Sequence, residues 1–372
     1  MPSSLRRRFT AVGLVVLLRA ANAYAVESVF ESHPASGPRN LRAIGRSREL
    51  LQQVLTLYPG ATVAVGLEGE IVWSAGFGYA NVPKEIPVST RTMFRIGQVA
   101  ESLTAALAVR LAEGGRLDLD AVVEKSIPAF PIKVFPVTAR QVAGHLAGLR
   151  PASKGDPAGQ KPCSGPQDAL SSFIHQPLVR VPGTAFLYSS HGYVLLSAVI
   201  ASACGQEYST CLEEKVLRPA GMNATVREGA GGRHPSASEF YERMLFGVLR
   251  QARPVDTSCA FGRGGYLSTA EDLVRFGMAL LGGELVSSEH LPEILSPQKT
   301  VSGASTGHGL GWRITVDSRG RRLSQSGRTI GGRSAIILVP ERRLVVTLLA
   351  NIDGAHLDDH ANRIAGFFLE PE

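Results

Sequence analysis

The polar side chains of one helix-like segment, residues 94–104, are the first candidates for chemistry. The segment reads F-R-I-G-Q-V-A-E-S-L-T and runs into an alanine-rich stretch over residues 105–112. Residues three apart on a helix share a face, so the carboxamide of Gln98 and the carboxylate of Glu101 would be neighbours. A carboxamide has no hydroxyl that a base could convert into a nucleophile. The pair can therefore bind through hydrogen bonds, or activate a water through Glu101, but cannot itself attack a carbonyl.

The same segment resembles the nucleophile helix of the serine β-lactamase and penicillin-binding-protein family, which reads F-R-I-G-S-x-S/T-K-S-L-T. In that family a Ser and the Lys three residues later carry out acyl transfer. Here Gln98 stands at the Ser position and Glu101 at the Lys position. The resemblance implies an enzyme framework from which the nucleophile and its base are missing.

Four further segments match the same family in the same order. Residues 137–149 read V-T-A-R-Q-V-A-G-H-L-A-G-L, residues 182–193 read P-G-T-A-F-L-Y-S-S-H-G-Y, and residues 264–273 read G-G-Y-L-S-T-A-E-D-L. These resemble V-T-x-R-x-L-L-x-H-x-S-G-L, P-G-x-x-F-x-Y-S-N-x-G-Y and G-G-x-x-S-T-x-x-D-L. The fourth is Q-S-G over residues 325–327, where relatives have His-Thr-Gly or Lys-Thr-Gly. The resemblance covers residues 41–370 and is strongest to the bacterial and mitochondrial serine β-lactamase-like group. That group is similar to class C β-lactamases, DD-peptidases and some esterases.

The resemblance also implies a role for each matching position. Tyr188 keeps the type of the family's proton-relay Tyr and is the only residue of the catalytic set that matches. The degenerate catalytic positions are Gln98, Glu101, Ser190, Gln325, Ser326 and Gly327. The backbone amides that stabilise the oxyanion would survive, because they do not depend on side-chain type. His145 stands where relatives keep a structural His, and we expect Glu101 to pair with Arg328 or Arg333.

Three functions stay open. The first is a pseudoenzyme that binds a peptide, a cell-wall fragment or a protein partner without turnover. The second is a weak or altered hydrolase, of peptidase, esterase or β-lactamase type, that uses a water activated by Glu101 with Tyr188 beside it. The third is a structural scaffold that no longer uses the cleft. No cofactor and no metal site is expected.

The hydrophobic pattern predicts one α/β unit built from both ends of the chain. A helix over residues 41–58, a hairpin over residues 61–80 and strands at 311–316, 322–326, 334–339 and 344–350 precede a last helix over residues 356–369. The resemblance implies an α/β/α sandwich of the β-lactamase/transpeptidase type. We expect a sheet domain of residues 41–97 and 301–372, a helical domain of residues 98–300 and a linker over residues 26–40.

Residues 1–25 have the features of a signal peptide. Arg6, Arg7 and Arg8 precede an eight-residue apolar run, and small residues offer cleavage after residue 23 or 25. The run is too short to span a bilayer, and we expect a periplasmic or secreted protein with no stable membrane span after cleavage. The Sec and twin-arginine routes both stay open.

Export makes the four cysteines candidates for disulfides. Cys204 and Cys211 could close a small loop, whereas Cys163 and Cys259 could pair only if two distant loops meet. The net charge of +7 includes four leader arginines, which leaves +3 for the mature chain. No run of Lys and Arg lies outside the leader, so nucleic acid is excluded as a partner.

Overall fold

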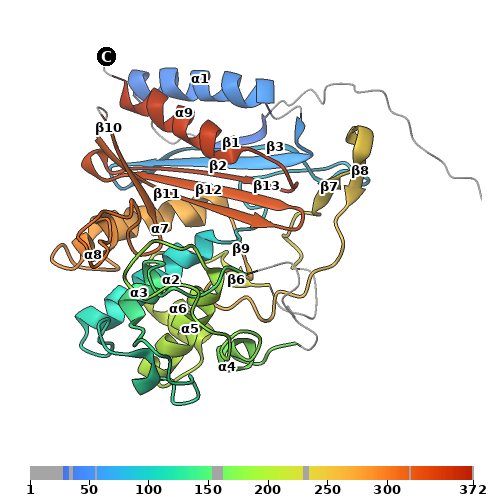
Figure 1. Cartoon of the computed structure of the whole chain (residues 1–372). Helices are drawn as coiled ribbons and strands as arrows, with labels where there is room; N and C mark the ends of the chain where they lie inside the picture. The colour runs from blue at the N-terminus through green and yellow to red at the C-terminus, as the bar shows by residue number, and fades with distance from the viewer. Residues whose placement is uncertain are drawn as a thin grey trace, which may run out of the picture.

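Strands from both ends of the chain form one antiparallel sheet in the computed structural model (Figure 1). The structure describes residues 28–32, 37–54, 57–152, 162–228, 234–317 and 320–370. The strand order is β1 (Ser28–Ser32), β3 (Glu70–Asn81), β2 (Gly60–Leu67), β13 (Leu344–Ala350), β12 (Gly332–Val339), β11 (Gly320–Thr329) and β10 (Arg313–Asp317), with β4 (Ile86–Pro87) paired to β3. The junction of β2 and β13 joins the two ends of the chain. The predicted sheet from both termini is confirmed.

Helices cover both faces of this sheet (Figure 1). On one face α1 (Pro38–Val54) and α9 (Leu357–Leu369) pack together over a core of strand side chains. On the other face α7 (Ala270–Gly282) lies against β2 and β13. Glycines allow this close approach, because a Cβ at Gly277 would stand 2.7 Å from a methyl of Val345. The architecture is the expected α/β/α sandwich. One of its helical layers is α7, whose residues lie within the segment 98–300 that was predicted as a separate helical domain.

The remaining helices form a compact group below the sheet in the view of Figure 1. Its centre is α5 (Ser190–Cys204), which is buried on almost every side and therefore apolar around its whole circumference. Packed around it or nearby are α2 (Val99–Glu113), α3 (Ala139–Ala143), α4 (Pro166–Leu170), α6 (Tyr208–Leu212) and α8 (Leu291–Leu295). Short helical turns are η2 (Val123–Lys125), η3 (Glu213–Leu217), η4 (Leu245–Gly247) and η5 (Pro340–Arg342).

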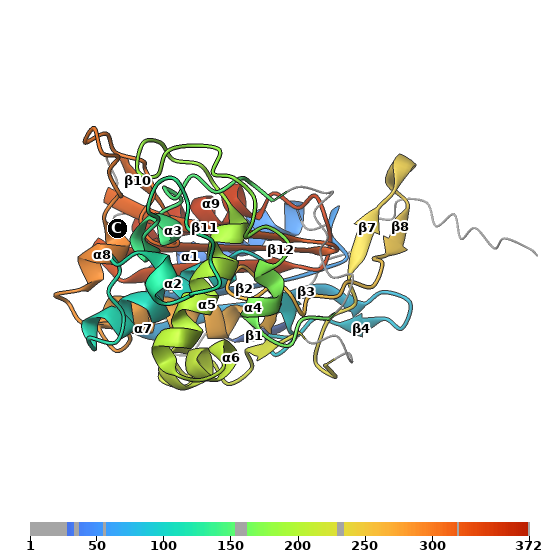
Figure 2. The same cartoon turned by 60° about the horizontal axis from the view of Figure 1, so that its bottom comes forward.

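Two small sheets complete the fold. In the first, β5 (Phe94–Arg95) and β6 (Val226–Arg227) both pair with β9 (Tyr266–Ser268), and β5 leads directly toward α2. In the second, β7 (Tyr241–Arg243) and β8 (Leu249–Gln251) form a hairpin that projects from the body in both views (Figures 1 and 2).

The segment predicted as a linker, residues 26–40, is instead partly regular structure. Residues 28–32 form the edge strand β1, and α1 begins at Pro38. The linker prediction is wrong there because β1 is held by distant partners, among them the Glu31 carboxylate, which accepts a hydrogen bond from Trp73 Nε1 at 2.7 Å. The predicted signal peptide lies outside the described residues. Within the described ranges, no helix is long and apolar enough to cross a membrane.

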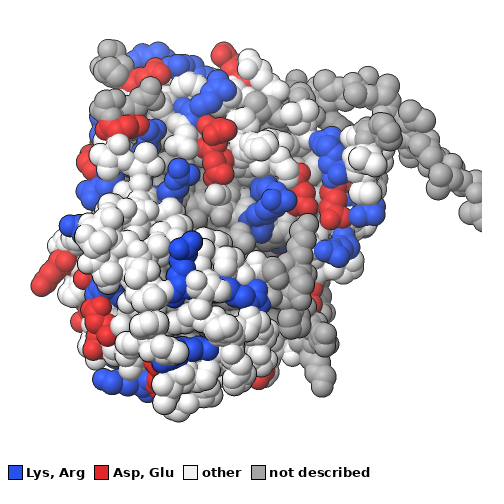
Figure 3. Space-filling model, viewed as in Figure 1, with Lys and Arg blue, Asp and Glu red and all other residues white. Residues whose placement is uncertain are grey.

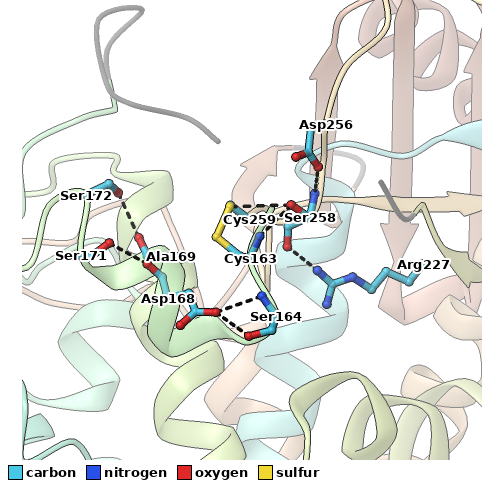
Figure 4. The surroundings of a disulfide bond; sticks show 10 residues. All are labelled: Cys163, Ser164, Asp168, Ala169, Ser171, Ser172, Arg227, Asp256, Ser258 and Cys259. Atoms are coloured by element: carbon cyan, nitrogen blue, oxygen red, sulfur yellow. Dashed lines mark hydrogen bonds between the residues drawn. A yellow bond between two sulfur atoms is a disulfide. The ribbon is translucent and has the colours of Figure 1, made fainter. Parts of the chain in front are cut away.

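Both candidate disulfides are formed, Cys163–Cys259 and Cys204–Cys211. Figure 4 shows the first, where the backbone N–H of Cys163 also donates to Ser258 Oγ at 3.0 Å. Arg227 anchors the same loop by donating to the carbonyl of Ser258. The two distant loops do meet, and one of them continues into Arg263, which belongs to the site described next.

Candidate active-site cleft

The start of α2 lies directly against β11, and two glycines make this contact feasible. Gly97 has a φ of +49°, and a Cβ there would stand 2.9 Å from the backbone nitrogen of Arg328. At the facing position, a Cβ on Gly327 would lie 2.0 Å from the carbonyl oxygen of Ile96. Gly327 is therefore a packing residue that lets β11 cross the end of β5.

Gln98 precedes α2 and turns its side chain toward β11. It makes no side-chain cap for the helix. Instead its Oε1 accepts a hydrogen bond from the backbone N–H of Arg328 at 2.6 Å. Arg328 follows the Gln325-Ser326-Gly327 positions on the strand expected to supply oxyanion amides. The carboxamide oxygen therefore occupies a donor that a reacting acyl group would need.

Glu101 lies one turn further along α2 and is completely buried, with 0% of its surface exposed. Tyr188 Oη donates to its Oε1 at 2.8 Å, and Gln325 Nε2 donates to its Oε2 at 3.3 Å. Burial raises the pKa of Glu101 to about 8, and the bond from Tyr188 offsets part of that rise. The carboxyl group is therefore mainly protonated and neutral at pH 7. Burial and the Glu101 carboxylate also raise the pKa of Tyr188 above its usual value.

His145, for which we expected a structural role, lies next to Glu101 and Tyr188. Its Nε2 lies 3.9 Å from Glu101 Oε2, and its ring centroid lies 4.6 Å from that of Tyr188. Burial is the main cause that lowers the pKa of His145 to about 3, followed by the charge of His308. The neutral imidazole supplies no positive charge to replace the missing Lys.

Arg263 is a cation of this site that the sequence reasoning missed. It is half-buried, its guanidinium donates to Ser190 Oγ at 3.4 Å, and its charge lowers the pKa of Glu101 and of Tyr188. Its place directly before the Gly264-Gly265 motif was the only signal for it in the sequence. The expected pairing of Glu101 with Arg328 or Arg333 is wrong, because the carboxyl oxygens of Glu101 are bonded to Tyr188 and Gln325 and the charge that acts on them is that of Arg263. Arg333 instead pairs with Asp353, with 3.5 Å between Nη1 and Oδ1.

The structure thus brings most of the proposed positions together in three groups. Gln98 meets Arg328, Glu101 meets Tyr188 and Gln325, and Ser190 joins through Arg263. Ser326 is exposed, and its side chain bonds to Asp358 rather than to this group. What the arrangement offers chemically is a set of hydrogen-bonding groups with a neutral acid at its centre.

Comparison with known proteins adds the family context. The sequence model of the β-lactamase family matches residues 48–368. The chain is 26% identical to the bovine (Bos taurus) "Serine beta-lactamase-like protein LACTB, mitochondrial", over 87% of this chain and 79% of that protein. It is 27% identical to "Penicillin-binding protein 4*" of Bacillus subtilis, over 78% of this chain and 67% of that protein. Among solved structures, a class C β-lactamase superimposes with a TM-score of 0.75 at 18% identity, over 92% of this chain and all 100% of that one.

Proposed function

This chain belongs to the β-lactamase family, and we propose that it is a member that has lost acyl transfer and keeps its cleft for binding. The observation that carries the proposal is the hydrogen bond from the Arg328 amide to Gln98 Oε1. A residue that replaces the nucleophile and also fills an oxyanion donor blocks two requirements of the reaction at once.

Acyl transfer needs a nucleophile, a base that activates it and donors for the oxyanion. Gln98 has no hydroxyl, and Glu101 is a neutral acid at pH 7 where active relatives carry a Lys. Loss of the nucleophile alone from such a unit lowers kcat by about 10⁶-fold.

Binding is supported by the polar groups that remain within reach of solvent. Tyr188 is 39% exposed and Arg263 is half-buried. On the face shown in Figure 3, Lys and Arg side chains gather where the sheet layer meets the helices. The ligand we propose is a peptide, a cell-wall fragment or a protein partner.

The same reasoning makes the weak-hydrolase alternative less favourable. A water activated by Glu101 would need an ionised carboxylate that water can reach. Glu101 is fully buried and has a pKa of about 8, so it meets neither condition at pH 7. We further propose that the protein is exported, because two disulfides are typical of an oxidising compartment.

Thermal unfolding in the presence of a panel of muropeptides and short peptides tests the binding proposal. A ligand that binds only the folded state raises the melting temperature. We expect at least one compound to do so, and we expect the rise to vanish in Arg263→Gln but to persist in Val316→Ser, a surface control on β10. If no compound shifts the melting temperature, or if Arg263→Gln leaves every shift unchanged, the cleft is not a binding site and the scaffold function stands.

A further inference from the structure

The β7–β8 hairpin is a regular, hydrogen-bonded projection rather than an irregular loop. Its strands pair in register, with Glu242 opposite Arg250, and its tip is closed by a hydrogen bond from Met244 N to the carbonyl of Val248 at 2.8 Å. Arg243, at the end of β7 next to the turn, donates to the carbonyl of Leu57, which follows α1. Both cartoon views show the hairpin standing away from the body (Figures 1 and 2).

The tip of this projection is apolar and faces solvent. Residues 244–248 read Met-Leu-Phe-Gly-Val, and the next residue, Leu249, is partly buried against the core. Leu245 is 81% exposed and Val248 is 59% exposed, and Met244 is exposed as well. The contact with Arg243 places a further exposed residue, Leu57, near the turn end of β7. Apolar side chains gathered on one protrusion mark a contact surface, because folding normally removes such groups from water.

Arginines flank the apolar tip on both strands. Arg243 ends β7, Arg250 lies in β8, and Arg253 follows that strand, and all three are exposed. Glu242 pairs with Arg250 at 2.9 Å, so one of these charges is partly compensated. Guanidinium groups match phosphate oxygens in charge and in geometry. Long Arg stems can lie along apolar surface while their heads stay in water.

We propose that the β7–β8 hairpin contacts a lipid bilayer, with its apolar tip in the interface and its arginines on anionic headgroups. The convex shape favours a lipid surface, which takes a narrow apolar protrusion without a preformed groove. The arginines lie behind the tip, at the level that phosphates would occupy if residues 244–248 entered the interface. A few apolar side chains together with neighbouring arginines attach a protein to a membrane weakly and reversibly. The mature protein would then work at a membrane surface.

Sedimentation of the mature protein with vesicles tests this inference. The vesicles are phosphatidylcholine alone and phosphatidylcholine mixed with phosphatidylglycerol. We expect binding to the anionic vesicles that weakens as salt is added, since exposed charges are screened. The double variant Leu245→Ser/Val248→Ser should lower the partition coefficient by roughly a hundredfold, because it removes two aliphatic side chains and burial of each is worth about tenfold or more. Arg250→Gln/Arg253→Gln should lower binding to anionic vesicles and leave any binding to neutral ones unchanged.

The matched control is Val316→Ser on β10, an edge strand of the main sheet, where the native side chain is 71% exposed. It should bind as the parent does. All variants change exposed residues, and equal melting temperatures verify that each is folded. The inference is overturned if the parent binds neither vesicle, or if Val316→Ser loses as much binding as the tip variant. It is also overturned if Leu245 instead drives self-association or capture of a soluble protein in the absence of lipid.

Discussion

The side-chain oxygen of Gln98 lies 2.6 Å from the backbone nitrogen of Arg328 and accepts its hydrogen bond. In an acyl transfer the amides of this strand would meet the developing oxyanion. The side-chain oxygen of Gln98 therefore accepts the hydrogen bond that the carbonyl oxygen of a substrate would accept. In the function that we propose, Gln98 stands in place of the nucleophile and also satisfies a backbone N–H that a substrate would otherwise meet.

The first prediction is that the mature protein forms no covalent adduct with β-lactams. Neither a Ser nor a Lys stands at the catalytic positions, and Gln98 fills an oxyanion donor. Intact mass spectrometry after incubation with a fluorescent penicillin measures this. A mass increase equal to the intact drug, mapped to residues 98–102, would falsify the prediction.

The second prediction is that Gln98→Ser and Glu101→Lys together restore measurable acylation, whereas either change alone stays at background. The serine needs an amine to take its proton, and the lysine needs a serine to act on. Removing the Gln98 side chain also releases the Arg328 amide. Recovery should be partial, because Ser190 and Gln325 still differ from active relatives. The readout is a burst with a chromogenic ester or β-lactam.

The control for that experiment is Gln98→Ala/Glu101→Lys, which frees the same amide and adds the same lysine but has no hydroxyl. It should show no burst. A double serine–lysine variant that keeps the parent's melting temperature yet gives no burst would show that the cleft has diverged beyond these two positions.

The third prediction concerns the pH dependence of stability. The pKa of Glu101 is about 8 in the folded protein against 4.5 for an ordinary Glu, so the folded state binds more protons between these values. Stability contributed by this group is therefore fully present below pH 4.5 and is lost as pH rises toward 8, by at most about 1.4 kcal/mol per pH unit.

Glu101→Gln resembles the protonated acid and does not titrate, so it isolates this effect from that of other groups. Its melting temperature should be close to the parent's at pH 5 and above the parent's at pH 8. Thermal unfolding across this range measures the difference. A constant gap between the two proteins at every pH would mean that Glu101 ionises alike in the folded and unfolded chain.

The fourth prediction compares the two disulfides. Cys163–Cys259 links residues 96 apart and Cys204–Cys211 links residues 7 apart. In the chain-entropy account a longer closed loop restricts the unfolded chain more, so removal of the first should cost about 2 kcal/mol more. Denaturant unfolding of the two Cys→Ala double variants measures both losses. Equal losses, or a larger loss for the short loop, would contradict this account.

The sequence predicted the sheet well because its strands are marked by local pattern. The hairpin of β2 and β3 and the runs that became β10 to β13 carry alternating or continuous apolar residues between turn residues. The same reasoning failed at β1, whose mixed residues Ser28–Ser32 have a weak pattern and depend on pairing with β3.

At the site, the sequence identified the positions but not their contacts. Order and spacing of motifs indicated Gln98, Glu101, Tyr188 and Gln325. The structure adds three contacts: Gln98 bonds to a backbone amide, Arg263 approaches Ser190, and His145 lies near Glu101. All three depend on how α2, α5 and β11 pack. Such contacts join residues far apart in the chain, and neither propensity nor periodicity encodes them.

The pairing of β2 with β13 also sets the order of events during synthesis. Thr347 and Ala64, whose hydroxyl and carbonyl lie 3.5 Å apart, are separated by 283 residues. The middle of the sheet cannot close until the last strand has left the ribosome, and contacts of such long range form slowly. Until then β2 presents an unpaired edge, which chaperones bind and which aggregates if left bare.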